Sequence, residues 1–350
     1  MFTNNNLKVA LAGIHRQVED TPGGHNWASA FAEVPDTKVV AIYDKDQKTR
    51  DEFQDTWLDT WGEMHQYNDY NDMIESVKPD IVCIATRQTY HAEHIESAVK
   101  HGVRGLVCDK PLCTDLNESD RIIKVLRESE TPFTFGLELR WSESYQAIFQ
   151  MLREGIIGNV TSVVAHGVTE LINHGCHFYD VALGMVGDPE PVSAIGIIDN
   201  PETFDDWRQG DPHGRGWISL DNGVNLGIMS EGEQRSYTIT GSDGRMTVMN
   251  EGELVYLWEN NIQAKKFSDK PRKIDVPRPS HPWPRGPASI RDLVDKIKKG
   301  GRTLCDVEET RRATEIGFAI HASNLLDGAR VSFPVKNRSI KIDSRPWGND

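Results

Sequence analysis

The sequence predicts an α/β domain with a parallel sheet at the N-terminus, followed by an α+β domain whose open sheet is mainly antiparallel. Up to about residue 158, short apolar stretches alternate with helical ones, as in parallel sheets. After that point, short strand-like stretches follow one another with Gly, Asn and Asp turns between them. A length of 350 residues also favours two domains over one.

The strands expected in the first part are apolar on both faces, which is typical of a buried parallel sheet. They lie at residues 7–12, 38–43, 80–85, 105–108 and 132–136. Helices are expected between them at 26–33, 46–57, 70–77, 91–101 and 115–129. A strand, a helix and a second strand in this order form a right-handed crossover unit. We therefore place the first domain at residues 1–137.

The second part, residues 138–350, is expected to form the second domain. Its predicted strands lie at 160–166, 192–198, 216–220, 224–230, 236–240, 245–249 and 254–258. The proline-bearing segment 259–288 is predicted to be a loop, and a long helix is expected at roughly 308–326.

Charge and composition exclude several classes of protein. The net charge of −14 argues against nucleic acid and anionic membranes as main partners. No window reaches the roughly 18 apolar residues of a membrane span, and the first residues do not resemble a secretory signal. The five cysteines are scattered, which predicts reduced thiols and a cytoplasmic protein.

The first predicted strand runs into Gly13, where a Rossmann sheet binds a dinucleotide, because a tight turn lets the backbone approach the pyrophosphate. The usual G-x-G-x-x-G is absent. We interpret the longer loop as an insertion of about ten residues, after which Gly23 and Gly24 open the helix. Gly13, Ile14, Gly24 and His25 are therefore candidate cofactor contacts. The alternative is that the Gly-Gly pair is only a turn.

Asp44 follows the second predicted strand, where a carboxylate accepts hydrogen bonds from the adenosine ribose. Because it also repels a 2′-phosphate, NAD is favoured over NADP, although the neighbouring Lys45 weakens that preference. The alternative is that Asp44 is a plain residue of the turn that ends the strand.

Several motifs follow one another along the chain in a specific order. They are Ala85-Thr86-Arg87-x-x-x-His91, Ala98-x-x-x-Gly102, Asp109-Lys110-Pro111, Gly155-x-x-Gly158, Asn173-x-x-x-His177, Gly241-x-x-Gly244 and the last helix with the tail after it. This ordered set resembles the Gfo/Idh/MocA family, the glucose–fructose oxidoreductase and inositol dehydrogenase group. Three positions depart from the family pattern, since Arg87 replaces a proline, Asp109 a glutamate and Asn173 an aspartate.

The resemblance implies a Rossmann domain, a second domain that binds substrate and forms oligomers, and an active site between them. It places Lys110 beside the substrate and the nicotinamide, with a cis bond expected before Pro111. It further implies cofactor contacts from the motifs that follow two of the strands, at Ala85, Thr86, Arg87, His91, Asp109 and Lys110.

In the second domain, His177 matches the family's histidine, and imidazole suits a base that takes a hydroxyl proton. Asn173 is expected to bind a hydroxyl but brings no charge. The alternative for His177 is a hydrogen-bonded core histidine. The alternative for Lys110 is an ion pair with an acidic neighbour. We expect no metal, although His166, His174 and His177 leave that question open.

Arg140 and Trp141 begin the second domain and, with His174, are candidate substrate contacts. For Arg140 a salt bridge between the domains is the equal alternative, and for His174 an exposed helix start.

The resulting prediction is an NAD-dependent dehydrogenase acting on a secondary hydroxyl of a sugar, inositol or related polyol. Two alternatives remain. The first is a family variant that recycles NAD during glycoside cleavage, elimination or epimerisation. The second is a non-catalytic protein that senses nucleotides. An exposed sheet face also predicts a homodimer or homotetramer.

Overall fold

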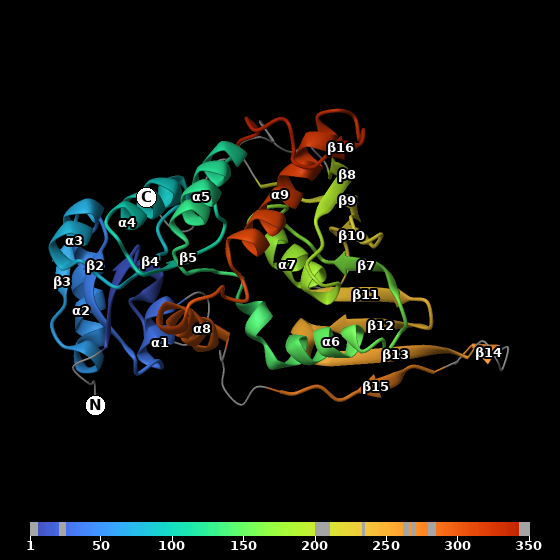
Figure 1. Cartoon of the computed structure of the whole chain (residues 1–350), viewed down its shortest axis with the longest axis horizontal. Coiled ribbons are helices and arrows are strands. Elements are labelled where there is room, and N and C mark those ends of the chain that lie inside the picture. The colour runs from blue at the N-terminus through green and yellow to red at the C-terminus, as the bar shows by residue number, and fades with distance from the viewer. Residues whose placement is uncertain are drawn as a thin grey trace. The chain divides into compact units, whose positions relative to one another are not determined.

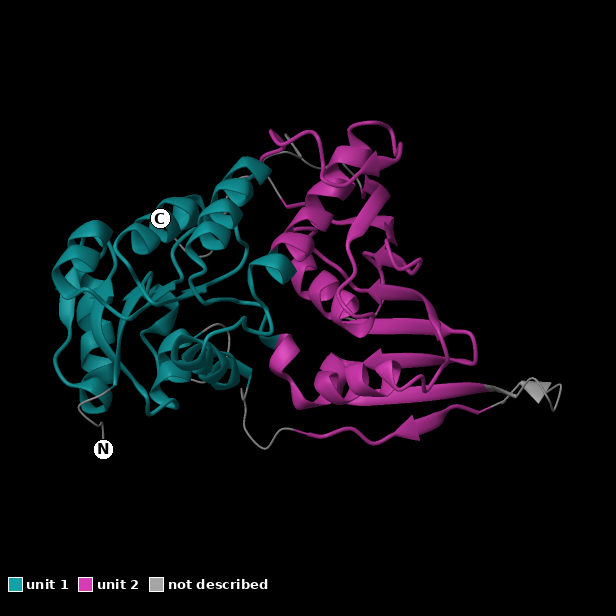
Figure 2. Cartoon of the chain, viewed as in Figure 1, with its two compact units in different colours: residues 1–138, 280–310, 346–350 teal, residues 139–279, 311–345 magenta. Residues whose placement is uncertain are grey.

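The computed structural model describes residues 6–20, 26–199, 211–232, 235–261, 266–267, 270–278 and 285–342. The chain divides into two compact units (Figure 2). Unit 1 comprises residues 1–138, 280–310 and 346–350, and unit 2 comprises residues 139–279 and 311–345. The division differs from the one drawn on the sequence in the return segment 280–310, which joins unit 1 rather than the second domain.

Unit 1 contains a parallel sheet of six strands in the order β3-β2-β1-β4-β5-β6. Its strands are β1 (Leu7–Ala12), β2 (Thr37–Tyr43), β3 (His65–Tyr67), β4 (Ile81–Ile84), β5 (Gly105–Cys108) and β6 (Phe133–Phe135). The strand order changes direction between β1 and β4, which is the switch point where ligands bind in open α/β sheets. The α/β prediction for this part is confirmed.

Helices cover both faces of this sheet. On one face lie α1 (Trp27–Ala32), α2 (Gln47–Trp61) and α8 (Arg285–Lys299), which share one apolar core with β1 and β2. The largest side chains of that core include Trp27, Phe31, Phe53 and Trp57. Figure 1 shows α4 (His91–Lys100) and α5 (Leu116–Ser129) on the opposite side of the sheet from α8, and α3 (Tyr70–Val77) packs against β2.

Helix α8 is absent from the sequence prediction, which placed a loop over 259–288. Pro287 is tolerated because it lies in the first turn of the helix, where backbone N–H groups have no partner within the helix, so its missing N–H removes no helical hydrogen bond. The helix buries Ile290 and Leu293 completely. A methyl group on Gly105 of β5 would lie 2.4 Å from Ile297, so the glycine admits α8 close to the sheet. This packing explains why the return segment belongs to unit 1.

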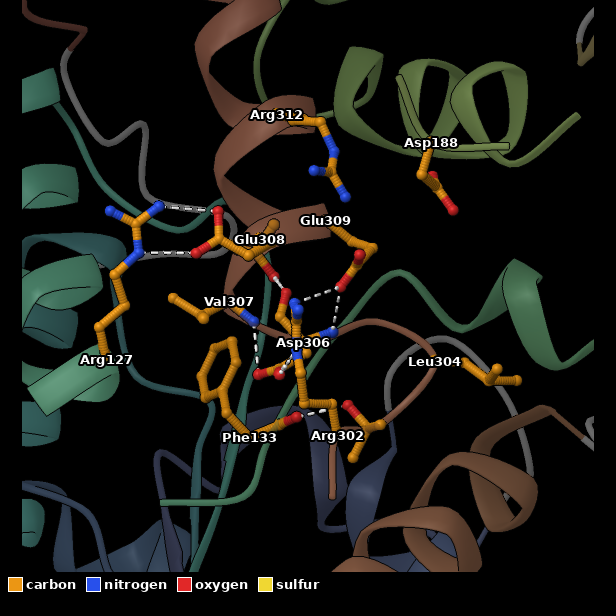
Figure 3. A network of polar contacts seen from close by, with 12 residues as sticks. Arg127, Phe133, Asp188, Arg302, Leu304, Asp306, Val307, Glu308, Glu309 and Arg312 are labelled. Carbon is orange, nitrogen blue, oxygen red and sulfur yellow. Dashed lines mark hydrogen bonds and ion pairs between the residues drawn. The ribbon is translucent and has the colours of Figure 1, made fainter. Parts of the chain in front are cut away.

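The start of α9 (Val307–Asn324) is anchored to unit 1 by polar contacts (Figure 3). Asp306 precedes the helix and accepts a hydrogen bond from the N–H of Val307 at 2.6 Å, while Glu309 accepts one from the N–H of Asp306 at 3.1 Å. Arg127 of α5 binds both carboxylate oxygens of Glu308, at 2.6 and 2.7 Å. The predicted final helix is therefore confirmed, with a capped start.

Unit 2 contains a mixed, mainly antiparallel sheet, as predicted. Among the described residues it has ten strands, nine of them in the order β14-β13-β12-β11-β7-β10-β9-β8-β16, with β15 paired to β13. Only the β7–β10 pair is parallel among these described pairs. The strands are β7 (Val160–His166), β8 (Pro191–Ile198), β9 (Gly214–Leu220), β10 (Asn225–Met229), β11 (Ser236–Gly241), β12 (Gly244–Met249), β13 (Leu254–Asn261), β14 (Lys266–Phe267), β15 (Arg272–Ile274) and β16 (Val331–Ser332).

Helices pack on one face of this sheet. They are α6 (Glu143–Arg153), which the sequence prediction left inside the join between the domains, α7 (Gly175–Met185) and most of α9. Helix α7 contacts β7 and α6, and Ile320 of α9 lies over Gly196 and Gly216, where a methyl group would meet it at 2.9 and 3.2 Å. None of the helices in the described part of the chain is long and apolar enough to cross a membrane.

Candidate functional site

The turn after β1 is held close to the turn after β4. Gly13 has φ +82°, and a methyl group there would lie 2.5 Å from both the carbonyl oxygen of Ala85 and the N–H nitrogen of Thr86. Its own N–H donates to the carbonyl of Tyr43 at the end of β2. Only glycine fits this position, and it brings the ends of β1, β2 and β4 together at the switch point.

Asp44 is built into this turn. One carboxylate oxygen accepts a hydrogen bond from the N–H of Ile14 at 3.2 Å, and the other accepts one from the N–H of Asp46 at 3.1 Å. The Asp44 side chain is half-buried and therefore keeps a face toward solvent. Ile14 is completely buried, and its N–H is already bonded to Asp44. Gly24 and His25 lie outside the described residues.

Gln17 connects the glycine turn to α1, a role that the sequence analysis did not identify. Its amide nitrogen donates to the carbonyl of Gly13 at 3.0 Å, and its amide oxygen accepts from the N–H of Ala28 at 2.9 Å. The side chain is 1% exposed. The next N–H, that of Ser29, is bonded to Asn26. Two amides at the start of α1 are thus already satisfied. Gln17 ends a short 3₁₀ turn, His15–Gln17, and no periodic pattern in the sequence marks it.

His91 ties the turn after β4 to the turn after β5. Its ring nitrogens lie 2.9 Å from the carbonyl oxygen of Thr86 and 3.2 Å from that of Leu112, and the ring is 1% exposed. Burial lowers the pKa of His91, against the raising effect of these carbonyl contacts. We therefore expect His91 to act on a ligand through the two turns that it holds.

Exposed groups surround the adenosine end of the same site. Arg87 is exposed at the start of a short 3₁₀ turn, Gln88–Tyr90. The Lys45 ammonium donates to the hydroxyl of Tyr90 at 3.0 Å and lies 4.6 Å from the centroid of its ring.

Burial among aromatic rings lowers the pKa of His94 to about 3. Tyr70 stacks on His94 with ring centroids 3.9 Å apart.

Lys110 lies at the carboxyl end of β5, next to the end of β6. Its N–H donates to the Asp109 carboxylate at 2.9 Å, and a methyl group on Gly136 would lie 2.8 Å from that carboxylate. Asp109 is 8% exposed, whereas Lys110 is half-buried. The Lys110–Pro111 bond is cis, as the family resemblance implied. In a parallel sheet these carboxyl ends share one edge, so Lys110 lies at the same edge as Gly13.

In unit 2, two histidines and an asparagine lie at the start of α7, where Asn173 and His174 directly precede the helix and His177 lies in its first turn. His177 is 2% exposed and Asn173 is 9% exposed. The rings of His174 and His177 lie edge to face with centroids 6.4 Å apart, and His174 bonds the hydroxyl of Thr169 at 2.9 Å. His174 directly precedes α7 but is half-buried, so it is not the exposed residue that the sequence analysis gave as its alternative.

Two carboxylates that sequence reasoning missed fix this turn. Asp211 accepts hydrogen bonds from the backbone N–H groups of Ile172 and Asn173, at 2.9 and 2.5 Å. Glu170 accepts one from the side-chain amide of Asn173 at 2.7 Å. Glu170 lies one helical turn before Asn173, which is a signal that could have been used. Asp211 lies 38 residues away along the chain from Asn173 and carries no local signal.

The Arg140 side chain forms ion pairs with two carboxylates of unit 2. It is 5% exposed, and its guanidinium bonds the carboxylate of Asp180 at 2.6 Å and that of Asp188 at 2.5 and 2.9 Å. This favours an ion-pair role, although both carboxylates belong to unit 2, whereas the sequence analysis gave a salt bridge between the domains as the alternative. Trp141 is half-buried beside it. Among the described residues, no group of three His, Cys, Asp or Glu side chains is placed to hold a metal ion.

Comparison with known proteins identifies the N-terminal part. Residues 8–137 match the model of a family described as oxidoreductases with an NAD-binding Rossmann fold. The D-glucoside 3-dehydrogenase of Escherichia coli is 22% identical over 207 residues, 54% of this chain and 56% of that protein. A D-apiose dehydrogenase of Rhizobium rhizogenes is 26% identical over 194 residues, 51% of this chain and 55% of that protein. The chain thus spans little more than half the length of these curated relatives.

Solved structures share the fold of the whole chain. A levoglucosan dehydrogenase in complex with NADH superimposes with a TM-score of 0.78 at 17% identity, covering 94% of this chain and all (100%) of that one. A myo-inositol 2-dehydrogenase from Lactobacillus plantarum superimposes with a TM-score of 0.71 at 21% identity, covering 93% and 99%. At these identities the likeness establishes the two-domain fold.

Proposed function

Because its N-terminal domain belongs to the Gfo/Idh/MocA oxidoreductase family, we propose that this chain is an NAD-dependent dehydrogenase that oxidises a secondary hydroxyl of a sugar, inositol or related polyol. The observation that carries the proposal is the closure of the Gly13 turn on Ala85, with Asp44 bonded to the N–H of Ile14. This is the backbone arrangement that a dinucleotide requires at the switch point of a parallel sheet.

The residues at this edge fit such a cofactor. The space that a side chain at position 13 would fill is occupied by the backbone of Ala85 and Thr86, so the turn after β1 is as tight as a dinucleotide-binding turn must be. The half-buried carboxylate of Asp44 has acceptor capacity left for ribose hydroxyls, since each oxygen bonds one amide. Exposed Arg87 and Lys45 border the adenosine end. When bound, the nicotinamide supplies the hydride acceptor.

The chemistry at the sugar needs a proton acceptor and a group that stabilises negative charge on oxygen. We assign the first role to the imidazole of His177 and the second to the ammonium of Lys110. Asn173 binds a neighbouring hydroxyl, with His174 and Trp141 as further substrate contacts. Arg140 supports this part of the site from within, through Asp180 and Asp188.

Purified protein supplied with NAD and a panel of sugars and polyols tests the proposal through the absorbance of the reduced cofactor. We expect Lys110→Met and His177→Asn to lose about 100-fold or more in kcat while binding NADH as the wild type does. Lys100→Met, an exposed lysine on α4, is the matched control and should retain activity. Confirmed cofactor binding with no turnover across the panel would contradict the dehydrogenase.

The test also separates the alternatives. Tightly held cofactor and turnover of glycosides without net reduction would indicate the variant that recycles NAD. Cofactor affinity that survives both substitutions, with no substrate found, would indicate a nucleotide sensor.

We also infer a homodimer or homotetramer. The face of the unit 2 sheet that α7 and α9 leave uncovered exposes Val192, Ile195, Ile197 and Trp217, each between 40 and 48%. Ile195 and Trp217 are paired neighbours on β8 and β9, so the patch is continuous. Light scattering should give a multiple of 39.4 kDa, and Trp217→Lys should lower it. A stable wild-type monomer would contradict this inference.

A cytoplasmic location forms part of the same proposal, because the five cysteines are buried and scattered along the chain. Cell fractionation tests it.

A further inference from the structure

Asn173 is held from two directions at the start of α7. Its backbone N–H donates to the carboxylate of Asp211, and its side-chain nitrogen donates to Glu170 at 2.7 Å. The residue is 9% exposed. A side chain fixed at both its backbone and its amide is poorly placed to reorient when a substrate arrives.

The partner decides which way the amide faces. An asparagine amide is nearly symmetric in shape but has a donor end and an acceptor end. An ionised carboxylate only accepts hydrogen bonds, so Glu170 pairs with the nitrogen of Asn173 and cannot pair with its oxygen. The carbonyl oxygen of Asn173 is thereby kept as the acceptor for the other groups around it. An aspartate at position 173 would offer an acceptor in either orientation.

The contact also supplies charge. Asn173 is neutral, yet Glu170 brings a carboxylate within one hydrogen bond of its amide. Two further groups of this turn carry or can carry charge, namely Asp211, which the backbone amides hold, and His174, which bonds Thr169 and packs edge to face against His177. The Cys176 thiol and the Tyr179 hydroxyl also face the turn and donate to the carbonyls of Asn173 and Leu171. A proton taken by His177 makes an imidazolium, and nearby negative charge favours that form.

We propose that Glu170 is a positioning residue of the reaction, which orients Asn173 as a hydrogen-bond acceptor and supplies the negative charge that Asn173 lacks. This proposal rests on the dehydrogenase function proposed above. Under this proposal Glu170 and Asn173 form one functional pair. The pair needs one carboxylate and one amide, and either residue can supply either group.

Three variants test the pair. Glu170→Gln keeps the size but removes the charge and frees the amide of Asn173 to turn over. We expect kcat to fall about tenfold, more than KM changes, with the acidic limb of the kcat pH profile moved to lower pH. Asn173→Asp places two carboxylates in contact and should also lose activity, because like charges at this distance repel.

The double variant Glu170→Gln with Asn173→Asp restores one carboxylate and one amide in reversed order. We expect it to recover kcat to within about threefold of the wild type, which independent structural losses would not do. A Glu170→Gln variant with unchanged kcat and pH profile overturns the proposal. So does a double variant as impaired as the product of the two single effects.

The chain contains a matched control for this bond. Asn250 donates its side-chain amide to Glu253, also three residues away and also at 2.7 Å, on the exposed surface of unit 2. Glu253→Gln removes the same kind of contact and should leave kcat, KM and the pH profile unchanged. Thermal unfolding of Glu170→Gln and Glu253→Gln shows whether any difference in activity is only a difference in folding.

A second readout does not need a substrate. The ring protons of His174 and His177, assigned by comparison with single His→Asn variants, report their titration by NMR. We expect Glu170→Gln to lower the titration midpoint of His177 in the free protein. If the midpoint moves but no sugar is oxidised, the proposed function fails and the positioning of the turn stands. If sugars are oxidised and Glu170→Gln changes neither readout, the positioning role alone is wrong.

Discussion

The backbone of Gly13 passes so close to Ala85 that a methyl group on Gly13 would lie 2.5 Å from the Ala85 carbonyl oxygen. Real side-chain carbons do not approach backbone atoms this closely, so the turn after β1 and the turn after β4 fit together only with glycine at this position. The relationship fixes the edge of the sheet at which we place the cofactor.

Gly13→Ala should therefore damage both stability and cofactor binding. A left-handed conformation costs an alanine about 1–2 kcal/mol, and the clash with Ala85 must move one of the two turns in addition. Chemical unfolding and titration with NADH measure the two effects, and we expect the Kd for NADH to rise about tenfold or more.

Gly62→Ala is the control for Gly13→Ala. Gly62 has φ +80°, close to that of Gly13, but no atom lies within 4 Å of the position of its missing methyl group. It should show the conformational cost without the loss of cofactor affinity. Equal effects of the two substitutions on NADH binding would contradict the role given to the Gly13 turn.

Asp44→Ser should change the choice of cofactor. The substitution removes a charge that repels a 2′-phosphate and leaves Lys45 beside the same ribose, so NADH should bind about tenfold more weakly while NADPH binds more tightly. Asp59→Asn, which removes one negative charge from an exposed position on α2, controls for net charge. If both variants give the same ratio of NADH to NADPH affinity, Asp44 does not select the cofactor.

Arg140→Met should destabilise unit 2 strongly. The guanidinium is 6% exposed and Asp180 is fully buried, so its removal leaves an uncompensated buried carboxylate, with a loss of about 3–5 kcal/mol. Arg104→Met, which breaks a 3.0 Å pair with Asp80 on a 52% exposed side chain, should cost less than about 1 kcal/mol. A stable Arg140→Met protein with a raised KM would instead support the substrate contact that the sequence left open.

Acid should weaken the fold through His321. Burial lowers the pKa of this α9 histidine from 6.5 to about 4. In the unfolded chain it takes up a proton below about pH 6.5, whereas the folded protein resists protonation down to about pH 4. Stability from this residue is therefore complete above pH 6.5 and is lost as the pH falls, by about 2 kcal/mol between pH 7.5 and 5.

Denaturant unfolding at these two pH values measures the effect. His321→Met should flatten the dependence by roughly this amount, since no proton is then taken up on unfolding at that position. The exposed His65, replaced by Gln, should leave the slope unchanged. An unaltered slope in His321→Met would show that other groups cause the acid sensitivity.

Much of the fold followed from local pattern. Most strands of both sheets could be predicted from short apolar stretches separated by turn residues, because side chains alternate across a strand and turns need Gly, Asn or Asp. The short strands β3, β14 and β15 were not predicted. Two helices show the limits. Helix α8 has a proline in its first turn and follows a proline-bearing segment, so the segment was interpreted as a loop, and α6 was assigned to the join between the domains.

In the candidate site too, some residues could be predicted from the sequence and others could not. Positions at strand ends, such as Gly13, Asp44 and Lys110, could be found because the carboxyl edge of a parallel sheet is known once the strands are. Gln17 and Asp211 could not, because no helical or strand period relates them to their hydrogen-bond partners. Glu170 was missed although it lies only three residues before its partner Asn173. The Arg140 guanidinium was assigned to two opposite roles until Asp180 and Asp188 were seen around it.

The sequence alone determined the two-domain class, the parallel order of the first part, the family of the N-terminal domain and the residue types available for chemistry. Those properties depend on side-chain periodicity and motif order, which a linear chain displays. Only the tertiary structure decided that residues 285–310 return to unit 1, that Arg140 pairs with the buried Asp180 and the half-buried Asp188, and that Asn173 is held by Glu170 and Asp211. These depend on the packing and directed hydrogen bonds of residues that the chain brings together only when it folds.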